Sequence, residues 1–178
     1  MLGMFVQDFE TVYEYVSNTV KDKCAIEHAY NVAMLQMASR YSCVALLHDV
    51  VEDGYATIDE LRKSLNLDDE QVAALDAITR RQGERYFDYI KRCKQNEMAK
   101  TIKLADLQDN INRCLKDLPN RYSLIGRYAK AYGILIRGGK CSIKLKNLQT
   151  EITGWIPMEI CGACSGIPRK TQKNLAKH

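Results

Sequence analysis

Residues 43–53 read Cys-Val-Ala-Leu-Leu-His-Asp-Val-Val-Glu-Asp, and this stretch decides how the rest of the chain is interpreted. Its composition suits a buried or half-buried helix, yet four ionisable residues lie inside the apolar run. Burying such groups is costly unless they are paired or bind a metal. One interpretation is a metal site with an acid/base pair beside it. The other is a core helix with an exposed polar end formed by His48, Asp49, Glu52 and Asp53.

The helical spacing of this stretch strengthens the first interpretation. On a helix over 42–52, His48 would lie over Glu52 and Asp49 over Asp53, because residues four apart share a face. We expect the helix to end at Asp53-Gly54, since glycine permits the left-handed turn that stops helices.

The composition is that of an ordinary globular domain. With 178 residues, 46% hydrophobic and 27% charged, the chain can form one domain with a proper core. No apolar run approaches the ~20 residues that a membrane helix needs, so no membrane contact is expected. The first eight residues lack the pattern of a secretion signal, so we expect a cytoplasmic protein. Seven cysteines without such a signal do not predict a disulfide framework.

The C-terminal part differs in composition from the rest. The net charge is only +4, but residues 166–178 carry four Lys or Arg and no acid. Because no basic patch is interleaved with aromatic residues, nucleic-acid binding is not expected. Cys161 and Cys164 form a C-x-x-C without a second pair, which we interpret as two thiols in a tail, half a zinc site being the alternative.

Apolar residues recur at helical spacing from residue 5 to residue 137. Thr57 and Glu60 match a capping box, and Asp68 or Asp69 is expected to cap the next helix. Short connections between helices favour an all-α bundle. We expect a domain over 1–137, a partly disordered extension over 138–178, and helices over 5–22, 27–39, 42–52, 57–65, 68–78, 84–94, 98–115 and 122–137.

Four ionisable residues with apolar neighbours form a candidate metal-ligand set in the core. Two imidazoles and two carboxylates suit Mn, Fe, Zn or Mg more than soft metals. Such a metal lowers the pKa of bound water and polarises a phosphoryl oxygen, and Glu52 and Asp53 would lie near enough to orient or deprotonate the water. The ligand candidates are His28, His48, Asp49 and Asp106. Taken alone, His28 reads as a partly exposed residue opening its helix, and Asp109 as part of a solvated face.

The order and spacing of these residues resemble the H…HD…D signature of the HD-domain metal-dependent phosphohydrolases. More narrowly, residues 48–53 are similar to the HDxxED motif of the RelA/SpoT-type ppGpp hydrolases. Residues 103–110, Lys-Leu-Ala-Asp-Leu-Gln-Asp-Asn, resemble the K-L-A-D-x-x-x-N segment of that branch. The resemblance covers roughly residues 20 to 115.

The resemblance implies a fold, a reaction and roles for residues. It implies an HD-domain helical bundle with a metal site in its core, manganese as the usual metal, and a nucleotide substrate. The family reaction is hydrolysis of the 3′-pyrophosphate of guanosine tetra- or pentaphosphate, releasing pyrophosphate. His28, His48, Asp49 and Asp106 would hold the metal, and Glu52 and Asp53 would activate the water. Asn110 would contact the ribose or its phosphate, and Lys21 would bind substrate phosphate.

The chain also departs from the family pattern. Members usually carry a longer basic, glycine-containing stretch and a Tyr-Ile-x-His-Pro run, whereas Ala29 stands at the proline position here. This removes expected contacts to phosphate and base, for which Arg80, Arg81, Arg85 and Lys103 could compensate. Two alternatives therefore stay open: an HD-type nucleotidase or phosphodiesterase acting on another phosphoester, and a nucleotide-sensing module without turnover. Formation of a homo-oligomer is also open.

Overall fold

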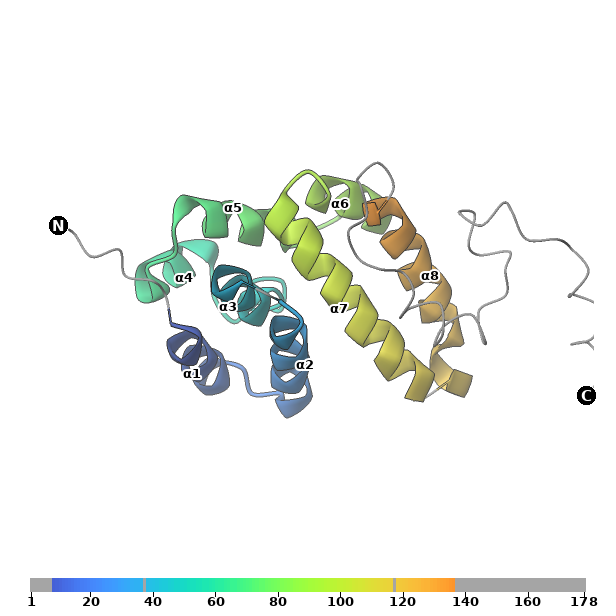
Figure 1. Cartoon of the computed structure of the whole chain (residues 1–178), viewed down its shortest axis with the longest axis horizontal. Coiled ribbons are helices and arrows are strands. Elements are labelled where there is room, and N and C mark those ends of the chain that lie inside the picture. The colour runs from blue at the N-terminus through green and yellow to red at the C-terminus, as the bar shows by residue number, and fades with distance from the viewer. Residues whose placement is uncertain (1–7, 37, 117, 137–178) are drawn as a thin grey trace, which may run out of the picture. The chain divides into compact units, whose positions relative to one another are not determined.

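The computed structural model describes residues 8–36, 38–116 and 118–136 (Figure 1). Within these residues the chain forms eight α-helices and no strand, which confirms the all-α prediction. The helices are α1 (Phe9–Thr19), α2 (Lys23–Met34), α3 (Ser39–Leu47), α4 (Ile58–Leu65), α5 (Asp69–Ile78), α6 (Tyr86–Cys93), α7 (Glu97–Lys116) and α8 (Leu118–Ile136).

Helix α3 is the centre of the N-terminal half of the fold. Its residues from Cys43 to Leu47 are only 0–1% exposed, because α1, α2, α5 and α7 all pack against it. A helix that is apolar on every side is stable only when it is covered on every side. The sequence Cys-Val-Ala-Leu-Leu therefore fixes which helix the others surround.

Helix α3 ends at Leu47, five residues before the predicted end, and residues 48–54 form turns. The His48 side chain bonds through Nδ1 to the Ala45 carbonyl at 2.7 Å, which satisfies a carbonyl of the last helical turn. The backbone tightens at the same place. The Val50 amide donates to the carbonyl of Leu47, three residues back, at 3.1 Å, whereas an α-helix would use the carbonyl four residues back. The predicted stacking on one continuous helix is therefore wrong for this segment.

The other helix starts follow side-chain caps. Thr57 and Glu60 form the predicted capping box of α4, and Asp68 with Gln71 caps α5 in the same way. Helix α2 begins at Lys23 behind the cap Asp22, four residues before the predicted start. His28 therefore lies in the second turn and is 5% exposed, so the reading of it as a partly exposed opening residue is wrong.

Helix α8 starts earlier than expected for a different reason. The sequence predicts this helix from residue 122, whereas Pro119 already lies in the first turn of the helix that begins at Leu118. Proline is tolerated there because its missing N–H would have no partner within the helix anyway.

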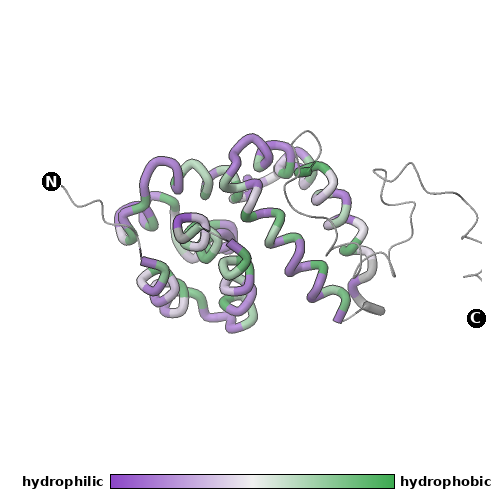
Figure 2. Tube along the Cα trace, viewed as in Figure 1, coloured by the Kyte–Doolittle hydropathy of each residue, from purple (hydrophilic) through white to green (hydrophobic). Residues whose placement is uncertain are grey.

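Helix α7 connects the two halves of the described fold, packing against α2, α3, α5 and α6 (Figure 1). Hydrophilic and hydrophobic residues alternate along it in Figure 2, as expected for a helix with one buried face. Asp106 lies on that buried face together with Ile102, Leu107 and Ile111. A carboxylate in this position needs compensating partners.

Arg92 of α6 fixes the end of α5. Its guanidinium donates to the carbonyls of Asp76, Ala77 and Thr79, at 2.9 to 3.2 Å. It also forms a two-pronged ion pair with Glu84, with N–O distances of 2.9 and 2.8 Å. This network holds the connection between α5 and α6 in place.

Other predictions concern cysteines, membranes and the chain ends. Cys24, Cys43, Cys93 and Cys114 carry thiols rather than disulfides. None of the described helices has the length and apolarity required to span a bilayer. The contacts group residues 1–135 into one compact unit. The extension predicted for 138–178, including Cys161 and Cys164, and residues 5–7 of the first predicted helix lie outside the described residues.

Candidate metal centre

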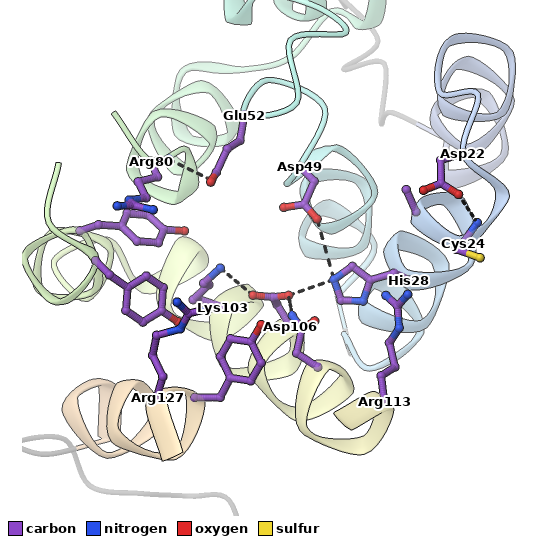
Figure 3. A pocket seen from close by; sticks show the side chains of 15 residues that line it. Asp22, Cys24, His28, Asp49, Glu52, Arg80, Lys103, Asp106, Arg113 and Arg127 are labelled. Carbon is purple, nitrogen blue, oxygen red and sulfur yellow. Dashed lines mark hydrogen bonds and ion pairs between the residues drawn. The ribbon is translucent and has the colours of Figure 1, made fainter. Parts of the chain in front are cut away.

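Three chain segments bring the predicted ligand residues together. His28 comes from α2, His48 and Asp49 follow the end of α3, and Asp106 comes from the middle of α7. His28, His48 and Asp106 are 1–5% exposed, whereas the Asp49 side chain is 42% exposed and faces a pocket. Figure 3 shows His28, Asp49 and Asp106 converging from separate segments of the chain.

The four donor atoms form a closed ring. His28 Nε2 lies 3.0 Å from Asp106 Oδ1 and 3.8 Å from Asp49 Oδ2. His48 Nε2 lies 3.0 Å from Asp49 Oδ2 and 3.7 Å from Asp106 Oδ1. With metal–ligand bonds of about 2.1 Å, neighbouring donors are about 3.0 Å apart around an octahedral ion and about 3.4 Å around a tetrahedral one. His28, His48 and Asp49 each offer a donor atom within 4.8 Å of the others, so these three side chains could hold one divalent cation, with Asp106 beside both histidines.

One buried atom of the ring has no hydrogen bond. His48 Nδ1 lies 2.7 Å from the Ala45 carbonyl, which only accepts, so we assign the proton to Nδ1. Nε2 then faces the ring, and in the neutral imidazole its lone pair lacks a hydrogen-bond partner although the residue is 1% exposed. Asp49 Oδ2, 3.0 Å away, is a partner for Nε2 only when the imidazole is protonated. A buried polar atom without a partner needs an explanation, and a bound cation provides one.

His28 is oriented by a carboxylate outside the ring. Its Nδ1 lies 2.6 Å from Asp109 Oδ2 and carries a proton, because a carboxylate only accepts, while Nε2 faces the ring 3.0 Å from Asp106 Oδ1. This is the outer partner that metal-binding histidines usually have. The Asp109 side chain is 13% exposed, so its assignment to a solvated face is wrong. Its position three residues after Asp106 on one helix was the available sequence signal.

Asp106 is compensated on both of its oxygens. Lys103 Nζ lies 2.6 Å from Oδ2, and Asn110 Nδ2 donates to Oδ1 at 2.5 Å. Burial alone would raise the pKa of Asp106, but Lys103 and the two histidines hold it well below its usual range. Burial likewise would lower the pKa of Lys103, but Asp106 raises it well above the usual range. This carboxylate is therefore ionised, as a metal ligand must be.

The carboxylates dominate the electrostatics around His48 as well. Burial alone lowers the pKa of His48, yet Asp49 and Asp106 together raise it to about 10. Without a cation, the ring thus binds a proton tightly. A divalent cation would take the place of this proton, because metal ligands must be deprotonated.

A cavity of about 390 Å³ opens beside the ring, within the range of ~300–1,000 Å³ that small-molecule sites occupy. Most predicted site residues line it, including the candidates for substrate contact Arg80, Lys103 and Asn110. Lys21 and Asp53 are exposed and are not among the lining residues. Sequence reasoning did not assign eight further lining residues to a site: Asp22, Cys24, Ala25, Tyr86, Tyr89, Arg113, Arg127 and Tyr128.

Glu52 lies on the side of this cavity formed by the turn after α3. Its carboxylate accepts from the backbone amide of Arg80 at 3.3 Å, and in Figure 3 the side chain points toward Arg80. The guanidinium of Arg80 donates to the Glu84 carbonyl at 2.7 and 3.1 Å. Arg81 pairs with Asp76, and Arg85 lies 3.9 Å from Asp88, so neither is directed into the cavity.

In comparisons with known proteins, no protein-family model matches this chain, and no curated protein matches it either.

Proposed function

We propose that this chain is a metal-dependent phosphohydrolase of the HD-domain type that acts on a nucleotide. The observation that carries the proposal is the closed ring of four donors with an unpartnered, buried His48 Nε2. The sequence resemblance around residues 20–115 supports the same class, since the ring residues are those at the matching motif positions. Manganese is the metal that the resemblance favours.

The residues around the ring suggest how the reaction would proceed. A divalent ion held by His28, His48, Asp49 and Asp106 would make a bound water more acidic and polarise a phosphoryl oxygen. Glu52 lines the same cavity as Asp49, so it is the candidate for taking the proton from the attacking water. Burial and the nearby Asp49 raise the pKa of Asp53, which favours a proton-accepting role there also, although it lies outside the cavity lining.

The best candidate substrate is guanosine 3′,5′-bis(diphosphate). In the proposed step, the water oxygen forms a bond to the phosphorus attached to the ribose 3′-oxygen. The bond between that phosphorus and the 3′-oxygen breaks, pyrophosphate leaves, and a proton from the water ends on the 3′-oxygen. Lys103 and Arg80 line the cavity and are the candidate contacts for the substrate phosphates. Asn110 lines the same cavity and donates to Asp106, and it is the candidate contact for the ribose.

A second candidate is hydrolysis of a different phosphoester. Two observations favour it: Lys21 does not line the cavity, and Ala29 replaces the proline of the family pattern. Both changes remove contacts that would select guanosine bis(diphosphate). The metal-centred part of the proposal is the same for both candidates.

A nucleotide panel tests the proposal and separates the candidates. The full chain is incubated with Mn²⁺ and each nucleotide, and released pyrophosphate and orthophosphate are quantified separately. We expect Glu52→Gln to reduce kcat by roughly 10²-fold or more while manganese binding persists. Glu97→Gln is the matched control, because Glu97 is an exposed residue that pairs with Lys100 outside the cavity. Absence of hydrolysis across the panel, or full turnover by Glu52→Gln, would overturn the proposed function.

A further inference from the structure

Exposed hydrophobic side chains gather on one part of the surface, the one formed by α1 and α2. Five large hydrophobic residues are exposed in the part of the chain that the structure describes, and only Tyr55 lies away from these two helices. Tyr13 of α1 is 36% exposed, Tyr30 and Met34 of α2 are 40% and 60% exposed, and Leu35 follows directly at 56%. Single exposed hydrophobic residues are normal, but a patch of them marks an interaction site.

The tyrosines of this surface are held in place by a third ring. The ring centroids of Tyr13 and Tyr30 are 5.7 Å apart, with the rings inclined at 68°. The Phe9 ring stacks on Tyr13 at 6.4 Å and meets Tyr30 edge-on at 6.3 Å. Met34 lies one turn after Tyr30 on the same face of α2. We name Tyr13, Tyr30 and Met34 the α1–α2 patch. Because its rings already pack on one another, little side-chain freedom is lost when a partner covers them.

The patch lies on the side of α2 that faces away from the metal centre. Residues two apart on a helix point in nearly opposite directions, so His28 is 5% exposed while Tyr30 is 40% exposed. A partner on the patch would therefore not touch the His28 side chain.

A hollow of about 260 Å³ borders the patch and carries charges of both signs. It is lined by Tyr13, Lys23, Ile26, Glu27 and Tyr30. Although Lys23 and Glu27 are four residues apart on α2, neither forms an ion pair within residues 8–36, 38–116 and 118–136. The hollow thus offers an unpaired cation and an unpaired anion beside one apolar surface. Such a surface is complementary to itself, because in a two-fold contact residue i of each copy meets residue j of the other.

We infer that the α1–α2 patch pairs two copies of this chain in a two-fold dimer. In this contact Lys23 of each copy lies near Glu27 of the other, and the aromatic rings and Met34 form the apolar centre. Tyrosine and methionine are enriched at the centres of protein interfaces. The dimer goes beyond the proposed function and does not depend on it.

The size of the patch sets the expected strength of the dimer. With ~200 Å² for a large side chain, the three exposures leave on the order of 300 Å² of patch surface on each copy. Two copies would bury about 600 Å² from these residues, and the charged rim adds to it, which is below the ~1,200 Å² of a standard interface. We therefore expect a weak, concentration-dependent dimer, with a Kd of about 1–100 μM.

Sedimentation equilibrium of the full chain from about 1 to 500 μM tests the dimer, since this range brackets the expected Kd. Tyr30→Glu places a charge in the apolar centre and should raise the dimer Kd at least tenfold. Met34→Glu, at the most exposed position of the patch, should do the same independently. Tyr55→Glu is the matched control, because Tyr55 is 37% exposed outside α1 and α2, and it should leave the Kd unchanged.

A charge exchange tests whether the partner is a second copy. Lys23→Glu or Glu27→Lys alone brings like charges together across the two-fold contact, so each should raise the Kd about threefold to tenfold. The double variant restores opposite charges with their signs exchanged, and it should recover the wild-type Kd.

A wild type that stays monomeric over the whole range would overturn the dimer. A dimer whose Kd is unchanged in Tyr30→Glu and Met34→Glu would show that another surface pairs the copies, and this also overturns the inference. Lack of recovery in the double variant would refute the two-fold contact of Lys23 with Glu27. Neither metal nor nucleotide is present, so these results are independent of the nucleotide panel.

Discussion

The contact between Asp109 and His28 gives a quantitative test of the metal centre. Asp109 Oδ2 accepts from His28 Nδ1 at 2.6 Å, a short charge-assisted hydrogen bond in a setting where the carboxylate is only 13% exposed. It fixes the imidazole with Nε2 facing the ring. Loss of such an outer partner typically weakens metal binding 10–100-fold, which corresponds to about 1.4–2.7 kcal/mol.

We therefore predict a graded effect of two substitutions. Asp109→Ala removes the acceptor and the charge, and it should lower manganese affinity by the full 10–100-fold. Asp109→Asn keeps an acceptor oxygen without the charge, so it should lie between Asp109→Ala and the wild type. Isothermal titration with MnCl₂ at neutral pH measures all three. Asp76→Asn is the matched control, since Asp76 is an exposed carboxylate that pairs with Arg81 and does not line the cavity.

Thermal unfolding of the metal-free variants must accompany these titrations, so that a folding defect is not mistaken for lost affinity. If Asp109→Ala folds normally and binds manganese as tightly as the wild type, the orienting role of Asp109 is refuted. Equal losses in the Asp76→Asn control would refute it as well, because the effect would then be one of general charge.

Three further predictions concern stability. Arg92→Ala should lower the free energy of unfolding by about 2 kcal/mol in urea titrations, because the carbonyls at the end of α5 and the Glu84 carboxylate lose their partner; no change would contradict the network. Arg92 lowers the pKa of Glu84 from 4.5 to about 2, so this ionised group stabilises the fold above pH 4.5 and the contribution is lost as the pH falls toward 2. The stability difference between wild type and Glu84→Gln should shrink over that interval, and a difference independent of pH would contradict the reasoning. Finally, Mn²⁺ at a hundred times its Kd should stabilise the wild type by about 2.7 kcal/mol, or roughly 10 °C in Tm, whereas an unchanged Tm would argue against binding to the folded state.

Local patterns in the sequence were sufficient for much of the helical framework. The apolar run from Cys43 to Leu47 predicts a covered helix, and Thr57 with Glu60 and Asp68 with Gln71 mark helix starts through local hydrogen bonds. These features depend on neighbours within a few residues. Spacing alone can therefore identify them.

The end of α3 and the surroundings of the ring depend on contacts that are distant in sequence or specific to one side chain. The apolar residues after His48 continue the helical pattern, and nothing local shows that the His48 side chain bonds to the Ala45 carbonyl. Asp109 belongs by spacing to a polar face of α7, and only the packing of α2 against α7 places it beside His28. Arg127 joins the cavity in the same way, through the rings of Tyr86 and Tyr128.

Binding of manganese to the full chain, followed by the electron paramagnetic resonance signal of free Mn²⁺, tests the metal centre itself. The ring predicts one saturable site per chain in the wild type and its loss in Asp49→Ala. Asp49 suits this substitution because its side chain is 42% exposed and its truncation leaves the core packing intact. Absence of a saturable site in the wild type, or undiminished binding by Asp49→Ala, would show that these four side chains do not form a metal centre.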